Sequence, residues 1–280
     1  MKIWAHTLVK NEERYIWYCL MSVIRYVDRI LVWDTGSTDR TLEMIAEIKK
    51  KYPDKVNFKQ VGDVTAEGFT KVRQEMLDAT DSDWFLILDG DEVWWDDSIK
   101  KVVGKIANKG NTIESIVVPM IYPIGDIYHR QEEAAGRYKL AGRRGHYALR
   151  AVNRKIPGLS SSNPHGTWGW TDGEGKMIQD RDPEKIFFVD APYMHFSLMP
   201  RGGNRSDDQK VVKRTQKLKY ELGTPFPADF FYPEVFFRPR PNIVPSPWIN
   251  MSRSYFLRAA IETPFKKIKR RFFLNNKIGY

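Results

Sequence analysis

The chain has 280 residues, a single cysteine and a formal net charge of +10 at pH 7. This length suffices for one large α/β domain with an appendage, and one cysteine excludes an internal disulfide. No window approaches the eighteen or more consecutive apolar residues of a membrane-spanning helix, and the first residues read as a strand rather than a secretory leader. We therefore expect a cytoplasmic protein, free or held peripherally on the inner face of the cell membrane.

The positive charge is concentrated at the carboxyl end. Residues 201–280 hold 17 Lys and Arg against 6 Asp and Glu, whereas residues 1–200 hold 28 against 29. This division predicts a nearly neutral body, residues 1–200, followed by a basic extension, residues 201–280. Such an extension favours an anionic partner, phospholipid headgroups or a lipid phosphate more than nucleic acid.

Strands and helices alternate through the first part of the chain. Strands are expected at residues 2–9, 29–34, 55–61, 84–88 and 113–120, and helices at residues 11–27, 39–50, 69–79 and 97–107. Strands that are apolar on both faces and alternate with helices predict an α/β fold with a mostly parallel central sheet between helix layers. In the first helix, Asn11 is the expected cap, Glu12 and Glu13 would favour the amino end, and Cys19 would be a buried thiol.

The pattern becomes less regular after residue 120. Residues 122–176 are expected to hold a few antiparallel strands and loops, and residues 185–196 one further strand. Ser206 with Gln209 predicts a capping box for a helix that ends before Gly223. The proline-rich, aromatic segment 226–248 is expected to wrap along the body.

Near the end of the chain, Thr263 and Pro264 read as the cap and first position of a basic amphipathic helix. Phe265, Ile268 and Phe272 fall on one side of this helix. Its other positions are mostly basic: Lys266, Lys267, Lys269, Arg270 and Arg271. Two interpretations stay open. The helix lies in an anionic membrane interface, or it docks on the body through its phenylalanines.

The segment WFLILDGDE, residues 84–92, is an apolar strand that ends in Asp89 and Asp91. Ligands bind at the carboxyl ends of strands in such sheets, and carboxylates are the hard oxygen ligands that Mg²⁺ or Mn²⁺ prefers. The segment predicts a metal site, with a helix cap or solvated turn as the alternative. His195, at the end of the strand expected at residues 185–196, is a candidate further ligand or a structural histidine.

A second motif, DTGSTD at residues 34–39, follows another strand and opens a helix. Gly36 permits a tight turn, while Ser37 and Thr38 can cap the helix and leave its amides free for a phosphate. An ordinary strand-to-helix turn is the alternative for this hexapeptide taken alone.

Three motifs occur in order: TLVKNEE after the first strand, DTGSTDRT after the second and LDGDE after a later one, with Arg73 in KVRQEML ahead of the last. This set resembles the family 2 glycosyltransferases of the GT-A fold, closely over residues 2–100 and more loosely to about residue 200. The resemblance implies a GT-A (Rossmann-like) nucleotide-sugar-binding catalytic domain in residues 1–200. It implies transfer of a sugar from a nucleoside-diphosphate sugar to an acceptor hydroxyl, assisted by Mn²⁺ or Mg²⁺ and inverting, in cell-envelope polysaccharide or glycolipid synthesis.

The resemblance also implies roles for single residues. Asp34 would hydrogen-bond the base, Arg73 would face the diphosphate, and Asp91 would be catalytic and ligate the metal together with Asp89 and His195. The whole donor-binding set would be Thr7, Leu8, Val9, Asn11, Asp34, Gly36, Ser37, Arg73, Asp89 and Gly90.

The acceptor side is less well marked. His165, Trp168 and Trp170 in NPHGTWGW could contact an acceptor sugar, with a loop that only packs as the alternative. The chain lacks the acidic pair that many relatives carry for the general base, so Asp172 and Glu174 in TDGEG are the candidates. The expected acceptor is a glycan or a lipid-linked molecule.

Three other functions fit parts of the sequence. A degenerate glycosyltransferase fold could act only as a sugar-binding module, but the intact Asp89 and Asp91 speak against this. A nucleotidyltransferase would carry a glycine-rich, basic loop after the first strand, whereas TLVKNEERY contains no glycine. A non-catalytic nucleic-acid-binding protein would line one groove with cations and aromatics. Here the nearly neutral residues 1–200 carry every nucleotide-like motif, so we expect no nucleic-acid partner.

Overall fold

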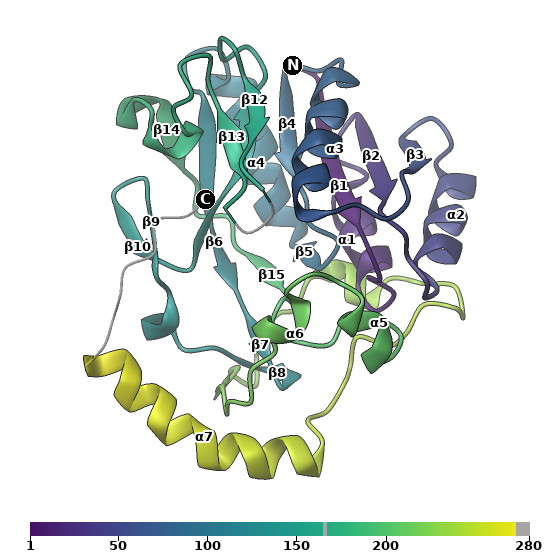
Figure 1. Ribbon diagram of the computed structural model, residues 1–280, viewed down its shortest axis with the longest axis vertical. Coiled ribbons are helices and arrows are strands. Elements are labelled where there is room, and N and C mark those ends of the chain that lie inside the picture. The colour runs from purple at the N-terminus through teal and green to yellow at the C-terminus, as the bar shows by residue number, and fades with distance from the viewer. Residues whose placement is uncertain (165–166, 273–280) are drawn as a thin grey trace.

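A mostly parallel sheet of nine strands forms the centre of the computed structural model, which describes residues 1–164 and 167–272 (Figure 1). The strand order is β3-β2-β1-β4-β11-β6-β15-β5, and β14 also pairs with β6. The strands are β1 (Ile3–Val9), β2 (Arg29–Asp34), β3 (Val56–Gln60), β4 (Trp84–Ile87), β5 (Glu92–Trp94), β6 (Ser115–Ile121), β11 (Tyr147–Asn153), β14 (Ile186–Phe188) and β15 (Tyr193–His195). Strands β1 to β4 are parallel, whereas β11 runs antiparallel to both β4 and β6. The predicted sheet is confirmed.

Helices cover both faces of this sheet, because its strands are apolar on both sides. The helices are α1 (Ile16–Val23), α2 (Thr41–Lys51), α3 (Ala66–Asp78) and α4 (Asp96–Lys109). The apolar sides of α1, α2 and α4 join one core cluster, while Val72 and Met76 of α3 pack with Trp4, Leu8 and Trp33 on the other side. The helices expected at residues 39–50, 69–79 and 97–107 therefore form within a few residues of their predicted bounds.

Small antiparallel sheets follow in the irregular region, as predicted. Strands β7 (Pro123–Ile124), β8 (Asp126–Arg130) and β16 (Thr224–Pro225) form one sheet, and β9 (Tyr138–Leu140) pairs with β10 (Arg143–Gly145). Strands β12 (Ser160–Ser162) and β13 (Gly169–Thr171) form a hairpin. Short 3₁₀ helices occur at Glu133–Ala135, Ile178–Asp180, Pro183–Lys185 and Glu234–Phe237.

Two boundaries differ from the sequence prediction in the body. The first helix begins at Ile16, because Asn11 adopts a left-handed backbone with φ of 53° and cannot act as its cap. The single strand expected at residues 185–196 is two strands, β14 and β15, which pair in turn with different parts of β6. Pro192 lies in the break between them and cannot donate a ladder hydrogen bond.

The helix predicted after Ser206 is also different. It is α5 (Arg205–Gln209), whose capping box is formed by Asn204 and Asp207 instead of Ser206 and Gln209. A second short helix, α6 (Arg214–Lys217), follows after Lys213, whose left-handed backbone (φ 58°) interrupts the helical path well before Gly223.

The proline-rich segment 226–248 wraps along the body, as predicted. The Tyr18 hydroxyl of α1 donates to the Pro245 carbonyl at 2.7 Å, and the Trp95 indole donates to the Phe231 carbonyl at 2.9 Å. Val235 and Phe236 of the segment are buried in the main core. These contacts fix an otherwise irregular chain.

The last described helix, α7 (Arg253–Phe272), begins ten residues before the predicted cap and contains Pro264 within it. The Ser252 hydroxyl accepts the Tyr255 amide, which supplies the amino-terminal cap. Docking through the phenylalanines is wrong, because Phe265 and Phe272 are 70% and 75% exposed while Thr263 and Arg270 are buried. Within residues 1–164 and 167–272, no helix has both the length and the apolar character needed to span a bilayer.

Candidate active site

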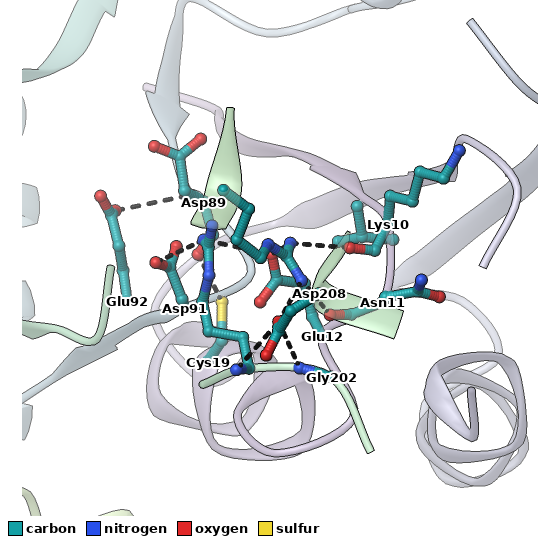
Figure 2. Close-up of polar contacts among 12 residues, drawn as sticks. Lys10, Asn11, Glu12, Cys19, Asp89, Asp91, Glu92, Gly202 and Asp208 are labelled. Atoms are coloured by element: carbon teal, nitrogen blue, oxygen red, sulfur yellow. Dashed lines mark hydrogen bonds and ion pairs between the residues drawn. The ribbon is translucent and has the colours of Figure 1, made fainter. Parts of the chain in front are cut away.

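The carboxyl ends of β1, β2 and β4 meet at one edge of the sheet. Val9 pairs with Asp34, and His6 pairs with Ile87, so the loops that follow these strands lie side by side. Figure 2 shows Glu12 from the first loop beside the turn that carries Asp89 and Asp91, while the side chains of Lys10 and Asn11 extend away from that turn. Gly202 and Asp208, far away in sequence, close the group from the other side.

The acidic turn after β4 is tightly seated. The Asp89 side chain is 28% exposed, whereas those of Asp91 and Glu92 are essentially buried. A Cβ atom at Gly90 would lie 2.8 Å from Cγ of Glu12, so the turn can rest on Glu12 only because residue 90 is glycine. The buried Cys19 thiol donates to the Asp89 carbonyl at 3.1 Å, which confirms the expected buried cysteine.

Asp89, Glu92 and His195 offer ligand atoms that all lie within 4.8 Å of one another. Asp91 adjoins this set, with its Oδ2 3.4 Å from Nε2 of His195. Oδ1 of Asp91 and Nδ1 of His195 are buried without a hydrogen-bond partner among the described residues, whereas Oδ2 of Asp91 is ion-paired. Carboxylates and an imidazole fit Mn²⁺ or Mg²⁺. The structure thus brings together the three predicted ligands, and adds Glu92, which sequence reasoning missed.

Two buried arginines face the acidic turn. Arg73 of α3 lies 3.3 Å from Asp89, and its predicted contact with a diphosphate stays a prediction. Arg150 of β11 lies 3.4 Å from the other Asp89 oxygen and also pairs with Glu92. Burial would raise the pKa of Asp89, but Arg150 and Arg73 outweigh it and hold that pKa below its usual value. Burial raises the pKa of Glu92 well above its usual value despite Arg150.

Arg150 reaches the site because of a β-bulge. Leu149 pairs with Val117 and Ala151 pairs with Ile116, so Arg150 is the extra residue between two successive pairs of the ladder. A bulge re-aims the side chain of the extra residue, here toward Glu92 and the Tyr193 hydroxyl, to which it donates at 2.9 Å. Nothing in the sequence around residue 150 signals this bulge.

Arg201 and Arg214 enter the site from the segment assigned to the basic extension. Arg201 places Nη1 2.6 Å from Asp91 Oδ2 and 3.2 Å from Glu12. Arg214 pairs with Glu12, lies 3.2 Å from Asp208 and donates to the Lys10 carbonyl at 2.8 Å. Sequence reasoning missed both arginines, because only the fold brings residues 201–214 over the first loop.

Glu12 is a buried counter-ion rather than a residue that favours a helix end. Burial raises its pKa to about 7, although Arg201 and Arg214 oppose the rise. This correction follows from Asn11, whose left-handed backbone turns the chain so that Glu12 points under Gly90. Residues 201–214 are held in place by the same carboxylate.

Asn11 ties three parts of the site together. Its Oδ1 accepts the Thr38 amide at 2.7 Å, and its Nδ2 donates to the Asp207 carbonyl at 2.9 Å. Its own backbone amide donates to the Ser37 hydroxyl at 2.9 Å. The predicted donor contact of Asn11 stays a prediction, but its structural role as a connector is defined.

The DTGST turn is tight, as predicted, with Gly36 at φ of 88°. The amides of Gly36 and Ser37 donate to Asp34 at 2.9 and 3.0 Å, and the Thr38 amide is taken by Asn11. These amides are therefore not free for a phosphate. Ser37 and Thr38 are not caps either, because α2 begins at Thr41, whose amide donates to Asp39.

Side chains on β1 alternate between the two faces of the sheet. Leu8 packs with the α3 cluster, whereas Val9 belongs to the core on the opposite face, and Thr7 is fully buried on that same face as Val9. The side chains of these three residues therefore cannot all line the same ligand.

The acceptor-stacking role of the two tryptophans is wrong. Trp168 and Trp170 are buried in a core cluster, and the Trp168 indole donates to the Ser161 hydroxyl at 2.7 Å. The Arg73 guanidinium lies 5.1 Å from the Trp168 ring, so this tryptophan supports Arg73 instead of a sugar. His165 lies outside the described residues.

Asp172 and Glu174 are not placed to act as the general base. Asp172 closes its own loop by accepting the amides of Glu174 and Lys176, and it pairs with Arg181, which also binds Glu114. The Glu114 carbonyl accepts the amide of Asn153, which is the β11 partner of Trp84. Trp84 begins β4, whereas Asp89 follows its end, so Asp172 lies toward the opposite edge of the sheet.

Sequence comparisons found a matching protein family and a similar curated protein. A family model described as glycosyl transferase family 2 matches residues 6–168, more than half of the chain. Over 85 residues the chain is 34% identical to a TPR repeat-containing protein of Synechococcus elongatus, a stretch that covers 30% of this chain and 19% of that protein.

Similar solved structures share less sequence. S. aureus TarS 1-349 in complex with UDP-GlcNAc is 16% identical, with 75% of this chain and 62% of that chain covered and a TM-score of 0.48. Glucosyl-3-phosphoglycerate synthase from Mycobacterium tuberculosis, in complex with Mn²⁺, UDP-Glc and phosphoglyceric acid, is 18% identical, with 76% and 78% covered and a TM-score of 0.44.

Proposed function

The chain belongs to glycosyl transferase family 2, and we propose that it transfers a sugar from a nucleoside-diphosphate sugar to an acceptor hydroxyl with the help of a divalent cation. One observation carries this proposal. The four metal-ligand candidates after β4 and on β15 are surrounded by the buried guanidinium groups of Arg73, Arg150 and Arg201. Carboxylates that hold a cation, next to arginines that accept an anion, suit a departing nucleoside diphosphate.

The residues that would hold Mn²⁺ or Mg²⁺ are Asp91 and His195, with Asp89 and Glu92 beside them. The buried Oδ1 of Asp91, which has neither a hydrogen bond nor an ion pair among the described residues, supports this assignment, since such an atom is costly unless a ligand satisfies it. When bound, the cation supplies positive charge that neutralises the leaving diphosphate.

The arginines would divide the remaining work. Arg73 and Arg150 approach the two oxygens of Asp89 from different elements, which orients that carboxylate and leaves a positive rim beside it. Arg201 neutralises Asp91 in the described structure. On donor binding, we expect the Arg201 guanidinium to exchange this carboxylate for a diphosphate oxygen. Guanidinium groups bind phosphate and carboxylate with the same forked geometry.

The finer assignments rest on family membership. We propose an inverting transfer to a glycan or lipid-linked acceptor, in the cytoplasm, during cell-envelope polysaccharide or glycolipid synthesis. The rigid turn formed by Asp34, Gly36 and Ser37 would lie beside the donor base. We propose no nucleic-acid partner for the protein.

The test is thermal stabilisation of the protein by UDP, GDP, dTDP and CDP, each with and without Mn²⁺. A diphosphate at a hundred times its Kd stabilises by about 2.7 kcal/mol, which raises the Tm by roughly 5–10 °C for a chain of this size. We expect one diphosphate to act only with Mn²⁺, and Asp91→Ala to abolish that response. The matched control is Asp97→Ala on α4, whose side chain is exposed and, among the described residues, pairs with Lys101 alone.

Two outcomes would contradict the proposal. Either no nucleoside diphosphate stabilises the protein at millimolar concentration, or Asp91→Ala keeps the full metal-dependent response. Hydrolysis of the matching nucleotide sugar by the wild-type protein, followed as release of the nucleoside diphosphate, then checks that the bound molecule is a donor.

A further inference from the structure

Exposed apolar side chains are concentrated on α7. Of the eleven large apolar residues that are exposed among the described residues, six belong to this helix. They are Phe256, Leu257, Ile261, Phe265, Ile268 and Phe272. Five of these, from Leu257 onward, recur at three- and four-residue spacings and form one continuous stripe, which we call the apolar stripe of α7.

The body holds α7 by its opposite face, mainly through polar contacts. The Tyr255 hydroxyl donates to the Lys219 carbonyl at 2.6 Å, and the Leu222 amide donates to the Thr263 hydroxyl at 2.8 Å. Arg270 pairs with Glu221 and also with Glu132. Figure 1 shows α7 lying along the outside of the molecule. The helix is therefore fixed in an orientation that keeps the apolar stripe in solvent.

Cations flank the apolar stripe. Arg253, Lys267, Lys269 and Arg271 are exposed and form no ion pair with any described residue. Glu262, the one acidic residue of α7, is already paired with Arg258 at 2.6 Å and with Lys266 at 2.7 Å. The free face of α7 thus combines an apolar stripe with four unpaired positive charges.

We propose that α7 binds the surface of an anionic phospholipid bilayer. The apolar stripe would enter the boundary between headgroups and acyl chains, and the four flanking cations would contact lipid phosphates. A second copy of the same face would bring its four cations against these four, which repel. A nucleic acid would satisfy the cations and leave the apolar stripe in water. The bilayer alone satisfies both parts of the surface.

The docking contacts place the donor site near this surface. Lys219, whose carbonyl holds α7 through Tyr255, follows Arg214, which pairs with Glu12 and Asp208 at the site. Five residues from Arg214 to Lys219 span at most about 18 Å when fully extended. A membrane-bound α7 would therefore keep the site close to the bilayer. Access to a lipid-linked acceptor is the consequence, which rests on the proposed function.

Co-sedimentation of the full chain with vesicles tests the proposal. One set of vesicles is phosphatidylcholine alone, and the other contains about one third phosphatidylglycerol as the anionic lipid. The apolar variant is Ile261→Ser with Phe265→Ser, and its matched control is Phe231→Ser with Phe237→Ser, two exposed phenylalanines elsewhere. The charge variant is Lys267→Gln, Lys269→Gln and Arg271→Gln. Its control is Lys49→Gln, Lys50→Gln and Lys51→Gln, exposed on α2.

We expect the wild-type chain to sediment with anionic vesicles and not with phosphatidylcholine alone. Each α7 variant should lose on the order of 100-fold in partitioning, and both controls should bind as the wild type does. Equal sedimentation of the α7 variants and their controls would overturn the proposal. The proposal would also be overturned if the wild-type chain formed dimers that dissociate in the variant Ile261→Ser with Phe265→Ser. Nucleic-acid binding by the wild type that is abolished in the charge variant alone would overturn it as well. The diphosphate-dependent shift in Tm should persist in all four variants, so a failure here is separable from a failure of the proposed donor site.

Discussion

His6 is a buried histidine whose charge state couples folding to pH. Its ring stacks on Phe85 at 4.5 Å between centroids, and its Nε2 lies 2.6 Å from the Thr80 hydroxyl. Burial, helped by Arg73, lowers its pKa to about 3. Because a histidine in the unfolded chain titrates near about 6.5, the unfolded state binds more protons between these two values. The stabilisation by neutral His6 is complete above pH 6.5 and is lost as the pH falls toward 3.

We therefore expect the free energy of unfolding, measured with urea from pH 7 to pH 4, to fall more steeply in the wild type than in His6→Gln. The substitution removes the titrating group, and the lost packing shifts the whole curve without adding a slope. Parallel curves for the wild type and His6→Gln would refute the coupling.

Residues of the site differ in how far sequence reasoning could find them. Asp89, Asp91 and Arg73 belong to local motifs whose strand or helix could be predicted, and the structure brings them together. Arg150 and Arg201 could not be found, because one depends on a bulge and the other on a loop that crosses the site from residue 201. Their positions are decided by long-range packing, which no short pattern encodes.

Two glycines in different elements should respond to alanine in opposite directions. Gly36, in the turn after β2, has φ of 88°, and an added Cβ would lie 2.7 Å from an Asp63 oxygen. Gly104 lies inside α4 and an added Cβ would meet nothing within 4 Å. Gly36→Ala should cost about 1–2 kcal/mol of stability, because the left-handed region penalises a side chain. Gly104→Ala should stabilise by about 0.5–1 kcal/mol, because alanine restricts the unfolded chain and favours the helix.

Denaturant unfolding of both variants beside the wild type checks the pair. A stabilised Gly36→Ala would mean that the turn can adopt an ordinary backbone, and a destabilised Gly104→Ala would mean that α4 is constrained at that point. Each variant serves as the other's control, since the chemical change is identical.

Elements were predictable where local signals and tertiary contacts agree. The apolar strands and the helical periodicity of α2, α3 and α4 suffice, because each helix buries the face that its own sequence marks. The predicted start of the first helix was several residues too early, because the Asn11 side chain hydrogen-bonds to the Thr38 amide and the Asp207 carbonyl instead of capping the helix. The predicted start of α7 was too late, because Pro264 was taken as the first helical position. The helix in fact continues on both sides of Pro264, where Thr263 and Arg270 are buried against the body.

At the scale of the whole molecule, polar contacts attach α7 to the body while its apolar stripe stays exposed. Arg270 is the main ionic contact, buried between Glu221 and Glu132, whereas its neighbour Arg271 is exposed. Burial would raise the pKa of Glu221, but Arg270 outweighs this and holds it below its usual value. Removing Arg270 would leave two partly or fully buried carboxylates without their cation.

We expect Arg270→Met to loosen α7, with a loss of about 3 kcal/mol of local stability that corresponds to roughly 100-fold faster hydrogen exchange of its amides. Arg271→Met, an identical change one residue away, should leave exchange in α7 unchanged because it removes no buried ion pair. The central sheet should exchange alike in both variants, since neither arginine contacts it. Equal exchange of α7 in the two variants would show that the hydroxyl contacts of Tyr255 and Thr263 hold the helix without Arg270. Faster exchange in Arg270→Met alone would identify this ion pair as the contact that keeps the apolar stripe directed away from the body.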